Sequence, residues 1–187
     1  MVFTWRGFAE INKFIPMKYI IATLFIATCH LALSQDLRTA LVNQLKNSHN
    51  NAAWFVPANA AVAELTAEQA SWKDGSGNHS VGQLVHHIVF WNERALTNLK
   101  GQKNPEFGGS NDETFDSFDK KTWDDLVKRL DAVMIGFETF VQEAPEAVLI
   151  EVAPLIANIS SHNAYHTGQI IFVRKLQKSW NPEKGVK

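Results

Sequence analysis

Apolar residues recur every three or four positions over four long stretches of the chain, which is the spacing of one buried face of an α-helix. In the first stretch, Leu37, Leu41 and Leu45 lie four residues apart. Together the four stretches cover residues 36–49, 80–100, 122–144 and 154–178. No alternation of apolar and polar residues typical of a β-strand appears. The pattern therefore predicts an all-α fold, a four-helix bundle.

Capping residues and turn formers set the expected ends of these helices. Ser80 and Gln83 have the spacing of a capping box, as have Thr66 and Gln69. Thr122 is suited to cap the third long helix. Prolines mark three further boundaries: the start of a short helix at Pro57, the end of the third long helix at Pro145, and the start of the fourth near Pro154. Residues 101–116 are expected to form a long crossover loop.

The first 34 residues differ from the rest. From Met17 the chain has one basic residue, an apolar run, and small residues up to Ser34, which is the layout of a secretory signal peptide. We expect cleavage between Ser34 and Gln35, with residues 1–16 as an upstream extension. Residues 35–187 are then one domain, exported to the periplasm or the cell exterior. The apolar run could instead stay as a membrane anchor, or Cys29 could carry a lipid.

Charge and cysteine content exclude several classes of function. The net charge is −1 and the chain has no basic block, so nothing suggests nucleic acid as a partner. Cys29 is the only cysteine and would be removed with the signal peptide. The mature chain would therefore have no disulfide, no cysteine nucleophile and no thiolate metal ligand.

Histidines carry the most specific chemistry in the sequence. His162 and His166 lie four residues apart, so on a helix both imidazoles lie on the same, apolar face and can reach one metal ion. In the second long helix, His87 lies between Leu84 and Trp91 on the inner face, whereas His86 is turned further outward and is the fallback. Three imidazoles on one ion leave an open position for water, as in catalytic zinc sites.

Each of these residues also has a plainer interpretation. A single histidine in a core is usually satisfied by a hydrogen bond alone, and His86, His79 and His49 are expected at the surface or at caps. No catalytic residue is identified; Glu93 is the one carboxylate near a ligand in sequence and is a candidate general base, although it points off the face of His87. Asn163 and Gln169 are candidates to orient ligands or water, and Trp91 to line a pocket. Zinc is the favoured ion, with nickel, iron and copper open.

Two segments resemble signatures of a known family. Residues 79–91, HSVGQLVHHIVFW, resemble the second-helix signature of the DinB-like and YfiT-like metal-dependent hydrolases. Residues 162–170, HNAYHTGQI, resemble their last-helix signature, His-x-x-x-His-x-Gly-Gln. The resemblance covers about residues 36–178 and implies a four-helix bundle in which His87, His162 and His166 bind a divalent metal ion. It also implies a homodimer.

The resemblance leaves three functions open. The first is an exported hydrolase that uses a metal-activated water on a small molecule of unknown identity. The second is a metal-dependent thiol S-transferase, as in a related branch, which export disfavours because low-molecular-weight thiols are kept reduced in the cytoplasm. The third is a non-enzymatic metal-binding or stress-response module in which the ion fastens two helices together.

Overall fold

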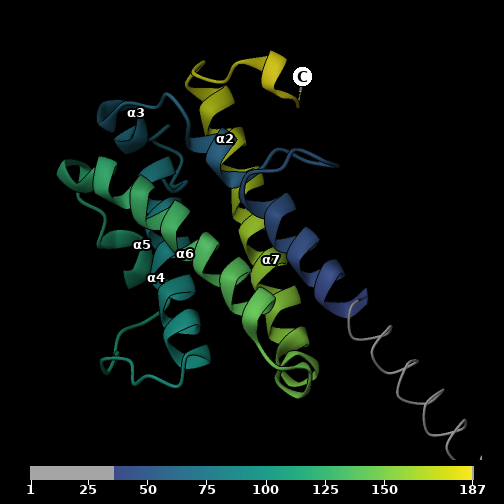
Figure 1. The fold of residues 1–187 in the computed structure, drawn as a ribbon. Coiled ribbons are helices and arrows are strands. Elements are labelled where there is room, and N and C mark those ends of the chain that lie inside the picture. Colours follow the sequence, from purple (N-terminus) through teal and green to yellow (C-terminus); the bar gives the residue numbers. More distant parts are fainter. Residues whose placement is uncertain (1–35, 187) are drawn as a thin grey trace, which may run out of the picture. The chain divides into compact units, whose positions relative to one another are not determined.

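The computed structural model describes residues 36–186 (Figure 1), and no β-strand occurs among them. The expected all-α class is thus confirmed for this part of the chain. Residues 36–49 are helical. The further elements are α2 (Ala58–Val62), α3 (Ala67–Ser71), α4 (Val81–Leu99), α5 (Glu113–Asp116), the 3-10 helix η1 (Lys120–Thr122), α6 (Trp123–Glu143), α7 (Glu146–Leu176) and the 3-10 helix η2 (Pro182–Lys184).

The long helices pack through the apolar faces that their sequences predict. Helix α4 lies against both α6 and α7. Leu84 and Ile88 of α4, Leu130 and Phe137 of α6, and Ile170 of α7 are all almost completely buried. Because α4 contacts both of its neighbours, one of its faces can meet residues of α7 while another packs on α6.

The helix at residues 36–49 is hydrogen-bonded to the C-terminal end of α6. Its Leu41 and Leu45 are buried. The guanidinium of Arg38 donates hydrogen bonds to the carbonyl oxygens of Val141, at 2.6 Å, and Ala144, at 2.9 Å. Arg38 thereby satisfies carbonyls at the C-terminal end of α6, which no longer have a partner within the helix.

Both predicted capping boxes are present. The Ser80 hydroxyl accepts from the backbone N–H of Gln83, and the side-chain oxygen of Gln83 accepts from the backbone N–H of Ser80. Thr66 and Gln69 do the same at α3. The expected capping bond from Thr122 is absent, because the Thr122 hydroxyl instead donates to the carbonyl of Asp119 at 2.7 Å.

The predicted start of the last helix was wrong. Helix α7 begins at Glu146 and includes Pro154 in its interior. A proline inside a helix removes one backbone hydrogen bond and normally ends or bends the helix. Here Leu149 and Ile156, on either side of Pro154, are both fully buried. Their burial continues the packed face across the proline and offsets its cost.

The environment of His49 also differs from the prediction. His49 was expected at the surface, yet only 1% of it is exposed. Its Nδ1 lies 2.6 Å from Glu138 Oε1, and its Nε2 lies 2.8 Å from Asp131 Oδ1. The amide of Asn59 donates to the same Asp131 oxygen at 2.6 Å. Carboxylates of α6 thus satisfy both ring nitrogens, which allows the ring to be buried.

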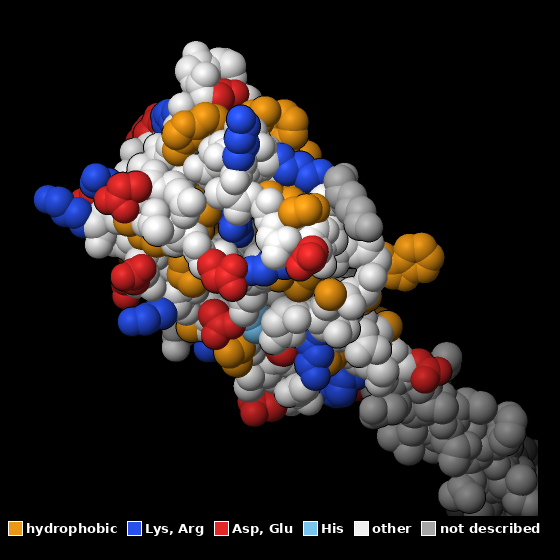
Figure 2. Space-filling view, turned by 90° about the horizontal axis from the view of Figure 1, so that it is seen from above, with side chains coloured by type: hydrophobic (Ala, Val, Ile, Leu, Met, Phe, Trp, Pro, Cys, Tyr) orange, Lys and Arg blue, Asp and Glu red, His pale blue; other side chains and the backbone are white. Residues whose placement is uncertain are grey.

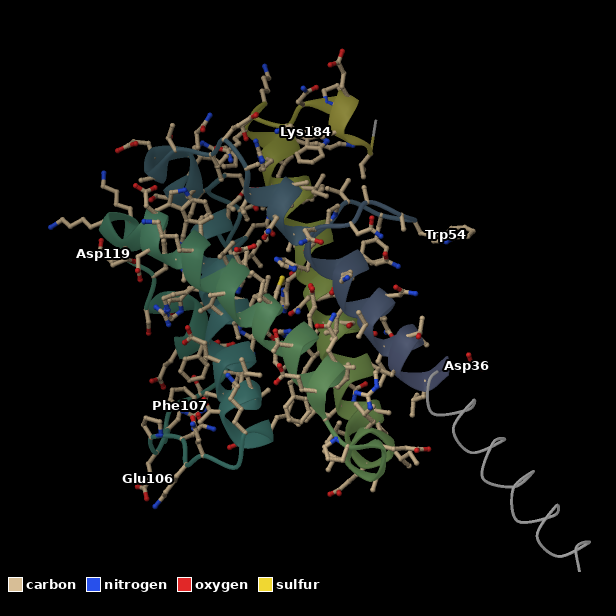
Figure 3. The ribbon with its side chains drawn as sticks, in the orientation of Figure 1. Asp36, Trp54, Glu106, Phe107, Asp119 and Lys184 are labelled. Carbon is tan, nitrogen blue, oxygen red and sulfur yellow. The ribbon has the colours of Figure 1, made fainter. Side chains whose placement is uncertain are left out.

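The surface carries charges of both signs. Figure 2 shows acidic and basic side chains interspersed with apolar ones over the face in view. The long loop between α4 and α5, with Glu106 and Phe107, extends to one side of the molecule, and Trp54 projects from another (Figure 3). None of the helices among residues 36–186 is long and apolar enough to cross a membrane.

The predicted signal peptide lies outside the described residues. This applies to its start at Met17, to Cys29 and to the cleavage site between Ser34 and Gln35. The domain boundary and the exported location stay predictions.

Candidate metal centre

Helices α4 and α7 bring the three predicted histidines together. His87 comes from α4, and His162 and His166 come from consecutive turns of α7. The Nε2 of His162 lies 3.2 Å from that of His87 and 3.1 Å from that of His166. One ring nitrogen from each residue lies within 4.8 Å of the other two. The three nitrogens thus converge on one point.

The spacing of these nitrogens fits a divalent metal ion. Zinc binds imidazole nitrogen at about 2.0–2.1 Å in tetrahedral geometry, so two such nitrogens are about 3.3 Å apart. The two Nε2–Nε2 separations, 3.2 and 3.1 Å, are close to that edge length. Without an ion, a proton on the Nε2 of His162 can be donated to only one of the other two nitrogens at a time, whereas an ion can bind all three. The donor set and its geometry therefore suit an ion.

The hydrogen bond of His87 leaves its Nε2 free to bind a metal. Its Nδ1 lies 2.6 Å from the Thr114 hydroxyl oxygen, and that hydroxyl donates its own hydrogen to the carbonyl of Asn111 at 2.6 Å. Thr114 can therefore only accept from His87, so the proton of the neutral ring is on Nδ1. The lone pair is then on Nε2, which faces the other two histidines.

Gln169 fixes the tautomer of His166 in the same way. The Nδ1 of His166 lies 2.6 Å from the side-chain carbonyl oxygen of Gln169. This oxygen only accepts, so the Nδ1 of His166 donates and its Nε2 is unprotonated in the neutral ring. Gln169, expected as an orienting residue, thus contacts a clustered histidine. Asn163, the other candidate, is buried, accepts from the Asn92 amide at 3.0 Å, and forms a hydrogen bond with His162 that acts to raise the pKa of that ring.

Burial keeps these imidazoles neutral. Burial, followed by the neighbouring His166 and His162, lowers the pKa of His87 from 6.5 to about 3. Burial lowers the pKa of His166 to about 4, although the bond to Gln169 acts in the opposite direction. Burial also lowers the pKa of His162. A metal ion at neutral pH therefore displaces no proton from the rings of His87 and His166.

An aromatic stack fixes the ring plane of His87. Phe115 of α5 lies parallel to the His87 ring at a centroid distance of 3.9 Å, and His79 covers the other face of Phe115 at 4.0 Å. His86, the fallback ligand, is turned away, and its Nδ1 lies 2.6 Å from the carbonyl oxygen of Thr114. The short helix α5 therefore holds both histidines, and His87 is the one that faces the cluster.

Helix α5 was not predicted from the sequence. Residues 101–116 were expected to be a loop, and neither Thr114 nor Phe115 was singled out. The one available signal was the apolar Phe115 in a polar segment, since a large apolar side chain in a loop usually packs on the core.

Glu93 does not reach the cluster. Its two carboxylate oxygens accept from Arg129 of α6 at 2.9 and 2.7 Å. Because Glu93 lies six residues beyond His87 on a helix of 3.6 residues per turn, its side chain leaves α4 on another face. The candidate general base is therefore corrected: Glu93 forms an ion pair between α4 and α6.

A pocket of about 380 Å³ opens beside two of the three histidines. It is lined by His87, Trp91, Asn92, Ala95, Asn111, Leu155, Asn158, Ile159 and His162. Trp91 is in its wall, as expected. A molecule in this pocket would lie directly against the convergent nitrogens of His87 and His162.

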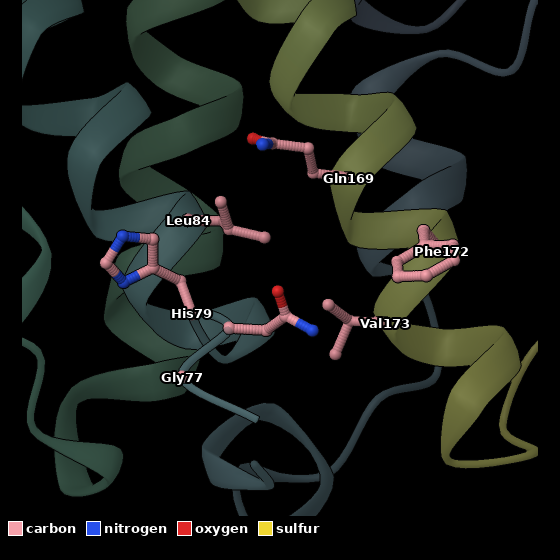
Figure 4. Close-up of a pocket in the computed structure, with 7 residues that line it drawn as sticks. Gly77, His79, Leu84, Gln169, Phe172 and Val173 are labelled. Atoms are coloured by element: carbon pink, nitrogen blue, oxygen red, sulfur yellow. The ribbon is translucent and has the colours of Figure 1, made fainter. Parts of the chain in front are cut away.

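A second, smaller pocket of about 160 Å³ reaches the site only through Gln169 (Figure 4). Gly77 and His79 form one side of it, Leu84 lies at its base, and Phe172 and Val173 of α7 form the other side. None of the three clustered histidines lines it. The larger pocket is therefore the better candidate for a substrate.

The chain belongs to the DinB superfamily. The family model of the DinB superfamily matches residues 58–170, which include all three clustered histidines and the whole of α4 and α6. Comparisons with curated proteins and with solved structures gave no match. The family membership predicted from the two histidine motifs is thus confirmed.

Thr114→Val is expected to weaken zinc binding by about 10- to 100-fold, because hydrogen-bond partners of metal-bound histidines typically contribute that much. Valine keeps the shape of the side chain and removes the oxygen that accepts from His87. Thr114→Ser keeps the oxygen and should restore the affinity of the unmodified chain. Isothermal titration calorimetry with zinc measures both. Equal weakening in the two variants would contradict a role for the hydroxyl.

Zinc binding is expected to persist at acidic pH. The pKa values of His87 and His166, about 3 and about 4, lie below pH 5, so only His162 could compete with a proton there. Affinity should fall by less than about 30-fold between pH 7 and pH 5, whereas three ordinary histidines would lose a factor on the order of 10⁴. Competition with a chromophoric chelator at both pH values measures the change. A loss above about 10³-fold would refute the expectation.

The metal-free protein should also become less stable on acidification. The unfolded chain binds protons at these histidines below about pH 6.5, and the folded chain does so only near pH 3 to 4. The unfolded state therefore binds more protons in that window, and the free energy of unfolding falls as the pH is lowered through it.

Proposed function

We propose that this DinB superfamily protein binds one divalent metal ion through His87, His162 and His166 and acts as a metal-dependent hydrolase. The observation that carries the proposal is the convergence of three Nε2 atoms from two helices, with separations of 3.1 and 3.2 Å. A pocket that shares two of these residues supports an enzymatic role. When bound, an ion held by three imidazoles lowers the pKa of a water molecule toward neutrality and so supplies a nucleophile.

The protein's own residues position the site. Thr114 and Gln169 hold the rings of His87 and His166 in the tautomer that presents Nε2. Phe115 keeps the His87 ring in plane. These supports are preformed, which limits the reorganisation that binding or reaction would need. No carboxylate lines the larger pocket, so the described residues offer no general base there.

Zinc is the proposed ion, with nickel and iron as alternatives, because imidazole ligands suit all three.

The protein is proposed to be exported, with cleavage of the signal peptide after Ser34. N-terminal sequencing of the protein secreted or released from the periplasm tests this, and a mature N-terminus at Gln35 is the expected result. A proposed homodimer would have twice the mass of the chain in light scattering.

The test of function is metal-dependent hydrolysis. The full-length chain is purified, loaded with zinc, and assayed against a panel of esters, amides and lactones, beside the same protein treated with a chelator. We expect hydrolysis of at least one class in the loaded protein, loss on chelation, and recovery on adding zinc. Bound zinc without any hydrolysis would remove the enzymatic part of the proposal.

The missing carboxylate specifically favours a second candidate, a non-enzymatic metal-binding module. In that case the ion fastens α4 to α7, and its main effect is on stability. The melting temperature would then rise strongly on zinc binding while the hydrolase panel stays silent. A thiol S-transferase remains an alternative only if activity requires an added thiol.

A further inference from the structure

The larger pocket differs from the rest of the surface in its lack of charge. His87 and His162 belong to its lining, and the remaining lining residues are four apolar residues and three asparagines. Among the described residues that line it, there is no lysine, arginine, aspartate or glutamate. The chain as a whole is 20% charged. An uncharged wall of this size therefore restricts what the pocket can bind.

Two charged residues of α4 that are close to the pocket in sequence contact other partners. Glu93, two residues after Trp91, is paired with Arg129. The guanidinium of Arg94 lies over the Phe107 ring at 5.7 Å and donates to the carbonyl of Pro105 at 2.9 Å. Neither side chain lines the pocket. The proposed ion supplies positive charge beside His87 and His162, so a charged group is disfavoured only on the part of a ligand that lies against the remaining wall, where it would lose water and find no protein counter-charge.

The apolar part of the wall favours a nonpolar ligand. Trp91 and Ala95 of α4 and Leu155 and Ile159 of α7 all line the pocket. Leu155 is 40% exposed, and Trp91 is only partly buried. Covering such surface stabilises a complex by about 25 cal/mol for each Å² removed from water. The volume, about 380 Å³, is at the low end of the range for small-molecule sites.

The three asparagines supply polar contacts without charge. Asn111 precedes α5, Asn158 belongs to α7 and Asn92 to α4, so they come from three separate parts of the chain. Asn92 is held in place because its amide donates to Asn163 at 3.0 Å. An amide both donates and accepts hydrogen bonds. Such groups recognise carbonyl and hydroxyl groups on a neutral molecule.

We propose that the substrate of this site is a small molecule with a polar, metal-binding group placed against His87 and His162 and an uncharged, mainly apolar remainder that lies against the rest of the wall. The inference rests on the proposed metal-dependent function and names the class of its substrate. It also disfavours charged peptide thiols as cosubstrates, because their carboxylates would have no partner in the wall.

Three hydroxamates of increasing size and charge test the proposal on the zinc-loaded, full-length protein. Acetohydroxamate has the metal-binding head alone, benzohydroxamate adds an apolar ring, and 4-carboxybenzohydroxamate adds a charge to that ring. We expect benzohydroxamate to bind at least about tenfold more tightly than acetohydroxamate, because its ring buries apolar surface. The carboxylate should weaken binding by at least about tenfold, because it is desolvated without a partner. Isothermal titration calorimetry measures all three.

Matched variants locate the binding to this pocket. Leu155→Glu places a charge in the wall and should weaken benzohydroxamate by at least about tenfold more than it weakens acetohydroxamate, which has no ring to lie against that wall. Ile150→Glu is the control, because Ile150 is on the same helix, is 61% exposed and does not line the pocket. It should change neither affinity.

The outcomes separate this inference from the proposed function. Equal binding of the charged and uncharged aromatic hydroxamates by the zinc-loaded protein would overturn the inference and leave the metal site intact. So would equal effects of Leu155→Glu and Ile150→Glu. A protein that takes up no zinc at the start of the experiment would overturn the proposed function itself.

Discussion

Replacing His166 by alanine is expected to remove most zinc binding. Zinc sites built from protein ligands have apparent binding free energies of about 10–16 kcal/mol, so losing one ligand costs about 3–4 kcal/mol, or on the order of 10³-fold in affinity. His87→Ala and His162→Ala should have effects of the same size, because all three Nε2 atoms converge on one point. Calorimetric titration with zinc, together with the metal content of each purified variant, measures this.

His86→Ala is the matched control for His87→Ala. The two residues are adjacent in α4, but the Nδ1 of His86 lies 2.6 Å from a backbone carbonyl oxygen and its ring is not in the cluster. Its removal should change zinc affinity by no more than about tenfold, the lower end of the effect of an indirect support. If His86→Ala abolished binding while His87→Ala retained it, the ligand on α4 would have been assigned to the wrong histidine.

The second large effect is expected for His49→Leu, which should lower the free energy of unfolding by about 3 kcal/mol. The buried His49 ring bridges Asp131 and Glu138 of α6, and its hydrogen bond contributes to lowering the pKa of Asp131. Leucine leaves both carboxylates without this partner, and the Glu138 side chain is only 13% exposed. The carboxylate of Asp131 is half-exposed and is hydrated again once His49 is removed. The expected loss in the free energy of unfolding is therefore at the low end of the range for breaking a buried ion pair.

Urea denaturation followed by circular dichroism measures this change. Lys184→Ala is the control, because it removes an ion pair with the exposed Glu64 at 2.8 Å and should cost much less stability than His49→Leu. The double variant His49→Leu, Glu138→Leu should regain part of the lost stability, because it removes the mostly buried carboxylate that His49→Leu leaves without its partner. Similar small effects of His49→Leu and Lys184→Ala would show that the cluster contributes little.

Much of the fold followed from local patterns. The burial of Leu84, Ile88, Leu130 and Phe137 was predictable because each helix must turn its apolar face to the core. The continuation of α7 through Pro154 was not, because it depends on packing that offsets the local cost of proline. Local propensity favours ending a helix there, and only the tertiary structure reverses that preference.

The three histidines of the candidate site could be predicted from the sequence, but the residue that hydrogen-bonds to the His87 ring could not. The spacing of His162 and His166 and the inner position of His87 follow from the helical period. Thr114 is 27 residues from His87 in sequence, and no pattern indicates that its loop returns to α4. For the same reason, the sequence could not show that Asp131 and Glu138 cover His49.

X-ray absorption at the zinc edge tests the central claim most directly. For the zinc-loaded full-length protein, we expect three imidazole nitrogens at about 2.0–2.1 Å and at least one further light atom in the first shell. His166→Ala, loaded with one equivalent of zinc, should show fewer imidazoles. A first shell with one imidazole or none in the unmodified protein, or a spectrum unchanged by His166→Ala, would contradict a metal centre formed by His87, His162 and His166.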